Sequence, residues 1–276
     1  MSDSALRFDR VTKNYGAVRA LDDVSFAVPR GAMFGLIGPD GAGKTTAIRL
    51  TGGLLTPDGG RIDVLGRDPK KDHRALTGAI GYLSQRFSLY GDLSIDENVA
   101  FFALAPFRRR RADRLSGGMK QKLALACTLV HEPELLLLDE PTTGVDPVSR
   151  REFWKLLAEF LARGLTIVMA TPYLDEAERC SRVALLHDGR LMALDEPPRL
   201  QAALAGQLLE VIVDAPRPPI DVLARVDGVA DVQSFGDRAH VRLAGIDQRR
   251  GAERIGEALA HAGVKPVGVR PIAASL

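Results

Sequence analysis

The feature that most constrains the fold of this chain is a glycine-rich octapeptide, Gly-Pro-Asp-Gly-Ala-Gly-Lys-Thr, at residues 38–45. It follows the apolar run 33–37 and precedes the helix-like stretch 46–50. A strand, a glycine loop and a helix in this order predict a phosphate-binding loop, because glycines let backbone N–H groups approach phosphates and the helix N-terminus adds its positive dipole end. Lys44 is placed to reach the β- and γ-phosphates, and the Thr45 hydroxyl to join a Mg²⁺ shell.

Length and composition predict a soluble globular protein. The 276 residues are enough for one large and one small domain, and a net charge of +2 is too small to indicate nucleic-acid binding. Cys127 and Cys180 lie in apolar, helix-like surroundings, which predicts buried thiols in a reducing compartment. No apolar run has the length of a membrane span, and the N-terminus lacks the pattern of a signal peptide. We therefore expect a cytoplasmic location, unless a partner holds the chain at a membrane.

The first 205 residues predict an α/β domain in which strands alternate with helices. Alternation of apolar and polar residues indicates strands over 6–11 and 23–28. Helical patterns cover 94–105, 116–130 and 147–162, and Pro147 suits a first helical turn. The remaining expected strands, including a hairpin around Asp188-Gly189, cover 61–65, 79–84, 135–138, 165–170, 183–186 and 191–194.

Residues 206–276 predict a separate small domain. Strand and helix patterns alternate there in the order βαββαβ, which suggests a ferredoxin-like α+β fold. The segment contains no triphosphate motif, so we expect an accessory role. The expected elements are strands over 208–213, 229–235, 239–243 and 264–269 and helices over 220–226 and 253–262.

Two further motifs extend the nucleotide hypothesis. The apolar strand 135–138 ends in Asp139-Glu140, which places both carboxylates at the carboxyl edge of a parallel sheet, beside the phosphate loop. There Asp139 can hold a Mg²⁺-bound water, and Glu140 can polarise the attacking water. Upstream, Ser116 is a good helix N-cap, and the glycine pair 117–118 exposes backbone N–H groups at a helix start. This helix end is suited to bind a γ-phosphate supplied by a second subunit.

In this order, the motifs resemble those of the ATP-binding cassette (ABC) ATPases over roughly residues 5–204. The amino-acid sequences of 81–90 and 175–179 are similar to those of the drug- and antibiotic-export branch, and the small domain that follows fits that branch too. The resemblance implies stacking of Tyr15 on adenine, a Q-loop glutamine at Gln85 that also joins the metal shell, a signature at 115–121, and a D-loop aspartate at Asp146. It implies that ATP is bound by Tyr15, Gly38, Pro39, Asp40, Gly41, Ala42, Gly43, Lys44, Thr45, Thr46, Ser116, Gly117 and Gly118, that Mg²⁺ is bound by Thr45, Gln85 and Asp139, and that Glu140 and Gln85 are catalytic.

Plainer interpretations of three of these residues stay open. Tyr15 is also consistent with an ordinary aromatic on an edge strand, and Gln85 with a simple strand end. Asp146 before Pro147 is a good helix N-cap, a structural task that is compatible with the functional one.

Two departures from the family pattern bear on activity. The position of the family's switch histidine holds Pro172, which cannot donate a side-chain hydrogen bond to a γ-phosphate or position a water. We therefore expect slow or absent hydrolysis in this chain's own site, with nucleotide binding retained. The segment 86–114 is shorter than the helical subdomain of relatives, which puts coupling to a membrane partner in question. The Pro172 context and the early C-terminus resemble the first half of a tandem cassette protein; a stand-alone subunit fits equally.

The sequence as a whole predicts the ATP-binding subunit of an ABC exporter, which hydrolyses ATP to drive a separate membrane permease. Two cassettes, identical or different, would sandwich ATP, with the chain held at the inner face of the membrane through its permease. The alternative is a catalytically weakened regulatory cassette that pairs with an active one. A cassette acting on nucleic acid is supported only by the four-arginine run 108–111, for which a solvated surface is the simpler interpretation. A GTPase or kinase is disfavoured, because neither explains the segment 115–121.

Overall fold

The computed structural model of the protein describes residues 4–85, 116–204 and 207–272. The whole segment 86–114, with the expected helix over 94–105 and the arginine run 108–111, thus lies outside the described residues. Among the helices that are described, none combines the length and the apolar character that a membrane crossing requires.

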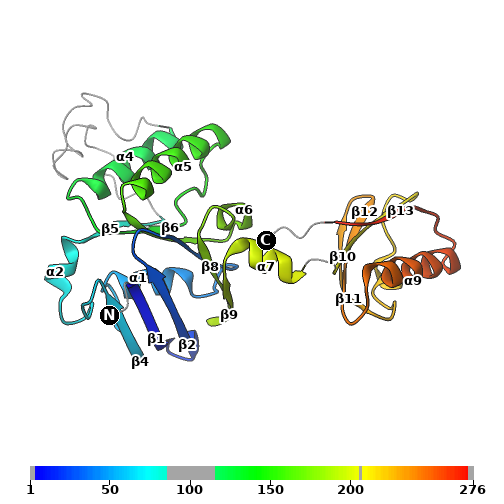
Figure 1. Ribbon diagram of the computed structural model, residues 1–276, viewed down its shortest axis with the longest axis horizontal. Coiled ribbons are helices and arrows are strands. Elements are labelled where there is room, and N and C mark those ends of the chain that lie inside the picture. Colours follow the sequence, from blue (N-terminus) through cyan, green and yellow to red (C-terminus); the bar gives the residue numbers. More distant parts are fainter. Residues whose placement is uncertain (1–3, 86–115, 205–206, 273–276) are drawn as a thin grey trace. The chain divides into compact units, whose positions relative to one another are not determined.

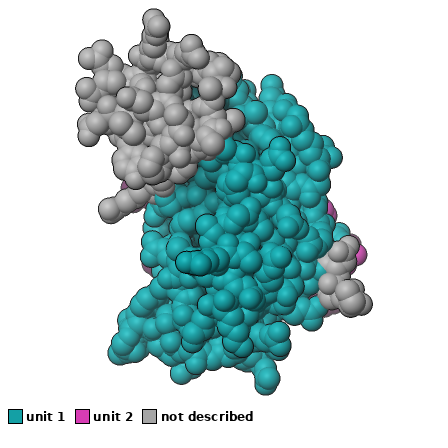
Figure 2. Space-filling model, turned by 90° about the vertical axis from the view of Figure 1, so that its left-hand side faces the viewer, with its two compact units in different colours: residues 1–197 teal, residues 198–276 magenta. Residues whose placement is uncertain are grey.

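The chain divides into two compact units, residues 1–197 and residues 198–276 (Figure 2). The first is built on a six-stranded sheet of order β5-β6-β7-β3-β8-β9, parallel except for β9, which pairs antiparallel with β8. Strands β3, β6 and β7 are buried along their whole length, as the apolar runs that they contain predict. In spatial order the strands are β5 (Ile80–Leu83), β6 (Leu135–Asp139), β7 (Thr166–Thr171), β3 (Met33–Ile37), β8 (Arg182–His187) and β9 (Arg190–Asp195).

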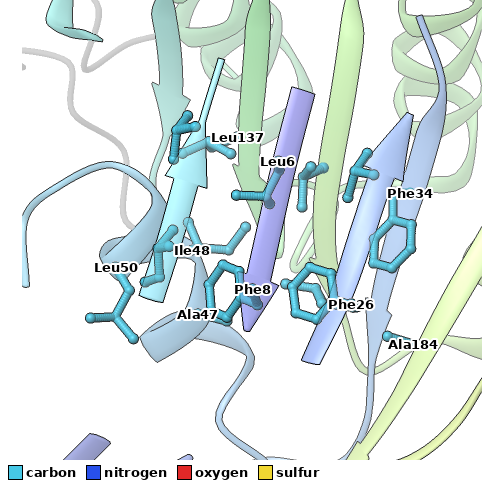
Figure 3. Close-up of a cluster of buried hydrophobic side chains, with 14 of the residues drawn as sticks. Leu6, Phe8, Phe26, Phe34, Ala47, Ile48, Leu50, Leu137 and Ala184 are labelled. Carbon is cyan, nitrogen blue, oxygen red and sulfur yellow. The ribbon is translucent and has the colours of Figure 1, made fainter. Parts of the chain in front are cut away.

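The main hydrophobic core of this unit joins the parallel sheet to helix α1 and to a second, three-stranded antiparallel sheet of order β2-β1-β4. Figure 3 shows side chains from both sheets and α1 meeting in this core. Phe26 stacks on Phe8 and on Phe34, with ring centroids 4.6 and 5.3 Å apart, so three strands share one aromatic stack. The elements are β1 (Ser4–Tyr15), β2 (Val18–Pro29), β4 (Gly59–Val64) and α1 (Lys44–Thr51).

Helices α4 (Gly117–Leu129) and α5 (Pro147–Ala162) lie on the other side of the parallel sheet from α1 (Figure 1). Helix α5 begins after Asp146, whose carboxylate accepts hydrogen bonds from two backbone N–H groups of the first turn, and it buries Phe153, Trp154 and Leu157. The shorter helices are α2 (His73–Thr77), α6 (Leu174–Ala177) and α7 (Pro197–Leu204).

The second unit contains a four-stranded antiparallel sheet of order β11-β12-β10-β13, with its elements in the predicted sequence βαββαβ. Its core is separate from that of the first unit and combines β10 and β12 with both helices. The elements are β10 (Leu208–Val213), α8 (Ile220–Leu223), β11 (Val229–Phe235), β12 (Arg238–Leu243), α9 (Gln248–His261) and β13 (Pro266–Pro271).

Several predicted boundaries are wrong, for identifiable reasons. Strands β1 and β2 run for 12 residues each, because several register shifts let one long hairpin accommodate an irregular apolar pattern. Helix α9 begins five positions before the predicted residue 253, since the Asp247 carboxylate accepts a hydrogen bond from Arg250 N and caps an earlier turn. Helix α8 ends at Leu223, short of the predicted residue 226.

Candidate functional site

The glycine-rich loop connects central strand β3 to α1 and is packed too closely to hold side chains at two of its glycines. A Cβ atom added at Gly38 would lie 2.2 Å from the carbonyl oxygen of Leu186, and one at Gly43 would lie 2.4 Å from that of Ala20. Gly41 and Gly43 have φ values of 82° and 99°, which L-residues with side chains rarely adopt. The glycines are therefore required by the loop's tight turn and by its contact with neighbouring strands.

Lys44, the first residue of α1, is folded back over this loop. Its ammonium group donates hydrogen bonds to the carbonyl oxygens of Gly38, at 2.8 Å, and Pro39, at 2.9 Å, and the residue is only 4% exposed. A buried cation requires compensating partners, and the loop carbonyls provide them. The positive charge is thereby fixed inside the curve of the loop, at the positive end of the α1 dipole. Both features favour an anion at this place.

Thr45 and Asp139 bring the loop and the end of β6 together. The Thr45 hydroxyl donates a hydrogen bond to Asp139 Oδ1 at 2.9 Å, although the two residues come from α1 and β6. Asp139 is 1% exposed, and burial raises the pKa of this carboxyl above its usual range, while the hydrogen bond from Thr45 acts in the opposite direction. A buried carboxylate of this kind is well suited to bind a cation, because a cation would lower the cost of its charge.

Glu140 and Gln85 complete the group of polar side chains at this edge of the sheet. Gln85 Nε2, just beyond β5, donates to Glu140 Oε2 at 2.9 Å, and Lys44 Nζ lies 3.9 Å from Glu140 Oε1. Glu140 adopts φ 49°, and its backbone N–H donates to the carbonyl oxygen of Ala170 in β7, at 2.8 Å. This left-handed conformation turns the chain sharply after Asp139, so consecutive carboxylates make different contacts.

Tyr15 lies at the tip of the β1–β2 hairpin and is 46% exposed. It pairs with Val18, two residues before Ala20, whose carbonyl oxygen is the neighbour of Gly43. The hairpin end that carries Tyr15 is therefore the part of the antiparallel sheet that reaches the phosphate loop. An exposed aromatic ring in this place is available to contact a ligand bound at the loop.

Ser116, Gly117 and Gly118 form the start of α4. Ser116 Oγ accepts a hydrogen bond from Met119 N at 3.3 Å, which confirms the predicted N-cap. Within the described part of the chain, no hydrogen bond or ion pair joins these three residues to the phosphate loop. This arrangement is compatible with the expectation that they act on the nucleotide of another subunit.

We expect Gly118→Ala to lower the free energy of unfolding by about 1–3 kcal/mol, because its Cβ would lie 2.1 Å from Ser149 Oγ and force α4 and α5 apart. Gly117→Ala is the matched control, since its Cβ would meet only the Gly144 carbonyl oxygen, at 3.4 Å. Urea unfolding of the full chain measures both variants. Equal stability of the two would show that α4 and α5 are not closely packed at Gly118.

A buried polar cluster, which no sequence motif identifies directly, lies at the ends of β6 and β7. Glu176 in α6 is fully buried and accepts hydrogen bonds from the hydroxyls of Thr142 and Thr171, the latter at 2.6 Å. Arg150 Nε of α5 lies 3.7 Å from Glu176 Oε1, and Tyr173 N donates to Thr171 Oγ1 at 3.1 Å. The cluster connects Thr142, which follows β6, to Thr171 at the end of β7, so it holds these two chain segments together.

Pro172 lies between Thr171 and Tyr173, inside the segment that this cluster holds. It adds no side-chain hydrogen-bond donor or acceptor. Because of Pro172 we expect slow or absent hydrolysis in the chain's own site, and this stays a prediction.

The two cysteines are buried, as their surroundings predict. Burial raises the pKa of Cys127 to about 11 and that of Cys180 to about 12, so both thiols are protonated at neutral pH.

A parallel sheet with a glycine-rich loop after a central strand and an acidic pair at the end of β6 defines a P-loop nucleotide-binding domain. A family model described as ABC transporter matches residues 21–143. The Nod factor export ATP-binding protein I of Paraburkholderia xenovorans is 38% identical over 248 residues, which cover 81% of this chain and 82% of the relative. This chain belongs to the ABC transporter family of ATP-binding proteins.

Two other relatives extend the comparison. The probable multidrug ABC transporter ATP-binding protein YbhF of Escherichia coli K12 is 42% identical over 231 residues, which cover 75% of this chain. The match spans only 40% of the length of YbhF. Among solved structures, the dimeric ATP-binding cassette MJ0796 in a post-hydrolysis state with ADP and Pi is 25% identical, with a TM-score of 0.62, covering 69% of this chain and 98% of that one.

Proposed function

We propose that this chain is the ATP-binding subunit of an exporter, which binds and hydrolyses ATP to drive a separate membrane permease. The observation that carries the proposal is the convergence of Lys44, Thr45, Asp139, Glu140 and Gln85 on the phosphate loop. Relatives that are described as acting in multidrug transport and Nod factor export support the direction of transport.

The residues around the loop fit a magnesium ion. Thr45 Oγ1 and Asp139 Oδ1 lie 2.9 Å apart, which is about the separation of adjacent ligand oxygens in an octahedron with bonds of about 2.0–2.1 Å. Gln85 uses its amide nitrogen on Glu140, which leaves its amide oxygen as a further ligand. Mg²⁺ bound here supplies charge neutralisation for the β- and γ-phosphates. We assign Thr45, Asp139 and Gln85 to this ion.

The chain's own side chains divide the remaining tasks. Lys44 and the backbone N–H groups of the loop bind the phosphates, and Tyr15 stacks on the adenine. Glu140 orients the attacking water and accepts its proton. The hydrogen bond that Gln85 donates to Glu140 holds the carboxylate in the orientation that this role requires. Lys44 therefore acts on the γ-phosphate, while Glu140 acts on the water that attacks it.

Two partners complete the proposed assembly. In a pair of cassettes, Ser116, Gly117 and Gly118 of each copy face the triphosphate that the other copy binds. Closure of the pair around ATP is transmitted to a membrane permease. We place the chain at the inner face of the membrane through this permease. The alternative of a purely regulatory cassette is not favoured by the relatives, whose descriptions concern transport and export.

The proposal is tested by titrating the purified full chain with Mg-ATP in a calorimeter and by co-purification with a membrane subunit. Saturable binding of Mg-ATP and recovery of a permease are the expected results. An absence of affinity for Mg-ATP would overturn the whole proposal, whereas binding without any membrane partner would overturn the export role alone.

We expect Pro172→His to raise hydrolysis by about tenfold, because an imidazole at this position adds a group that can hold the γ-phosphate or the water. The cluster around Glu176 keeps the backbone of residues 171–173 in place. Single-turnover hydrolysis of the two proteins gives the comparison, with Pro172→Ala as control. An equal rise in the alanine variant would assign the effect to loss of proline rather than to the imidazole.

A further inference from the structure

An ordered ion pair lies against the ring of Tyr15. Lys13 Nζ is 5.8 Å from the centre of this ring, and it donates a hydrogen bond to Asp58 Oδ1 at 2.9 Å. Lys13 and Tyr15 are two positions apart on β1, and the lysine lies over the ring although the strand is irregular at this point. The side chain of Lys13 is only 15% exposed. The cation therefore lies over the ring rather than extending into solvent.

Asp58 is held by backbone hydrogen bonds in addition to the one from Lys13. Asn14 N donates to Asp58 Oδ2 at 2.6 Å, and Asp58 N donates to the Thr12 carbonyl oxygen at 2.9 Å. The backbone hydrogen bond from Asn14, followed by that from Lys13, holds the pKa of Asp58 below its usual range. An isolated surface ion pair contributes little, because two flexible side chains must be ordered to form it. Here the acidic partner is ordered already.

Resting on the proposed function, in which Tyr15 stacks on the base, we propose that Lys13, held by Asp58, is a positioning residue for that ring. The ammonium lies over the ring, 5.8 Å from its centre, while 46% of Tyr15 remains exposed and accessible to an aromatic base. A cation over an aromatic ring is attracted to its negative face, which restricts the ring to one orientation before the ligand arrives. Ordering the ring in advance lowers the entropic cost of stacking.

The Lys13–Asp58 pair also has a structural role, because it connects β1 to the residue before β4. This structural role must be distinguished from the positioning of Tyr15. A purely structural role would change stability, or the affinity for every triphosphate alike. A positioning role acts only on ligands that carry a base, since inorganic tripolyphosphate occupies the phosphate loop without touching Tyr15. The ratio of the two affinities therefore separates the roles.

The experiment measures dissociation constants of Mg-ATP and of magnesium tripolyphosphate for the full chain by calorimetry. We expect Lys13→Met to weaken Mg-ATP binding by about two- to fivefold and to leave tripolyphosphate binding unchanged. Asp58→Asn should give a smaller change of the same kind, because asparagine keeps an oxygen for Asn14 N. Lys13→Arg should restore the wild-type ratio, since a guanidinium also binds over a ring. Lys71→Met, which removes a surface lysine 3.8 Å from Asp68, is the matched control.

The inference is wrong if Lys13→Met weakens both ligands in the same proportion or leaves both unchanged. It is also wrong if the wild-type chain binds ATP no more tightly than tripolyphosphate, an outcome that leaves the proposed ATP-binding function standing. Wild-type protein that binds neither ligand would overturn the proposed function, and this inference with it.

Discussion

Glu140→Gln should lower ATP hydrolysis by about 10²–10⁴-fold while the protein still binds Mg-ATP. The amide has the shape of the carboxylate and keeps an oxygen for Gln85 Nε2, which lies 2.9 Å from Glu140 Oε2. It cannot accept the proton of the attacking water, so only the chemical step is affected. Lys44 Nζ lies 3.9 Å from the other oxygen, and removal of this negative charge leaves the cation fully available to the phosphates. Bound ATP should therefore persist in the variant.

Single-turnover hydrolysis by the full chain, with ATP binding followed separately, is the appropriate measurement. Glu134→Gln is the matched control, because this exposed glutamate pairs with Arg30 at the opposite end of β6. We expect the control to hydrolyse ATP at the wild-type rate. An unchanged rate in Glu140→Gln would remove Glu140 from the role of base, even if nucleotide binding is normal.

The parts of the fold that the sequence predicts well are those specified by local pattern. The continuous apolar run before Asp139 matches β6, and the bounds of α5, Pro147–Ala162, are those expected from the Asp146-Pro147 pair. In both cases the signal lies within the element or one residue outside it. Periodicity and capping are enough to find such elements.

The features that the sequence does not predict depend on contacts between distant segments. The Lys13–Asp58 pair joins residues 45 positions apart, and Thr142 meets Glu176 across 34 positions. Neither carboxylate differs in local pattern from an ordinary surface acid. Glu176 becomes distinctive only when α6 packs behind β7 and removes it from water. Burial of a charge is a tertiary property, so single-sequence reasoning cannot identify it.

The same distinction applies to the candidate site. The glycine loop, Lys44 and the acidic pair are visible in the sequence because their spacing is a local requirement of phosphate binding. The conformation of Glu140, with φ 49° and a backbone hydrogen bond to Ala170, depends on pairing with β7. That turn brings Glu140 to Gln85 and Lys44, and it is the geometry on which the assignment of the base rests.

Lys44→Ala should weaken Mg-ATP binding by at least about 100-fold, because a hydrogen bond to a charged group contributes about 1.5–3 kcal/mol and this lysine can make two with the phosphates. Its ammonium is already directed into the loop by the carbonyl oxygens of Gly38 and Pro39, so little reorganisation accompanies binding. Alanine has the highest helix propensity, and α1 should therefore still form from residue 44 onward.

Calorimetric titration with Mg-ATP measures this loss, and thermal unfolding of the same sample shows whether the fold survives. Lys71→Ala, an exposed lysine elsewhere in the same unit, controls for the removal of one positive charge. Lys44→Arg gives a second test, because a planar guanidinium keeps the charge but does not match the geometry of a buried ammonium group. Wild-type affinity in a folded Lys44→Ala protein would mean that the triphosphate is bound somewhere other than the loop after β3.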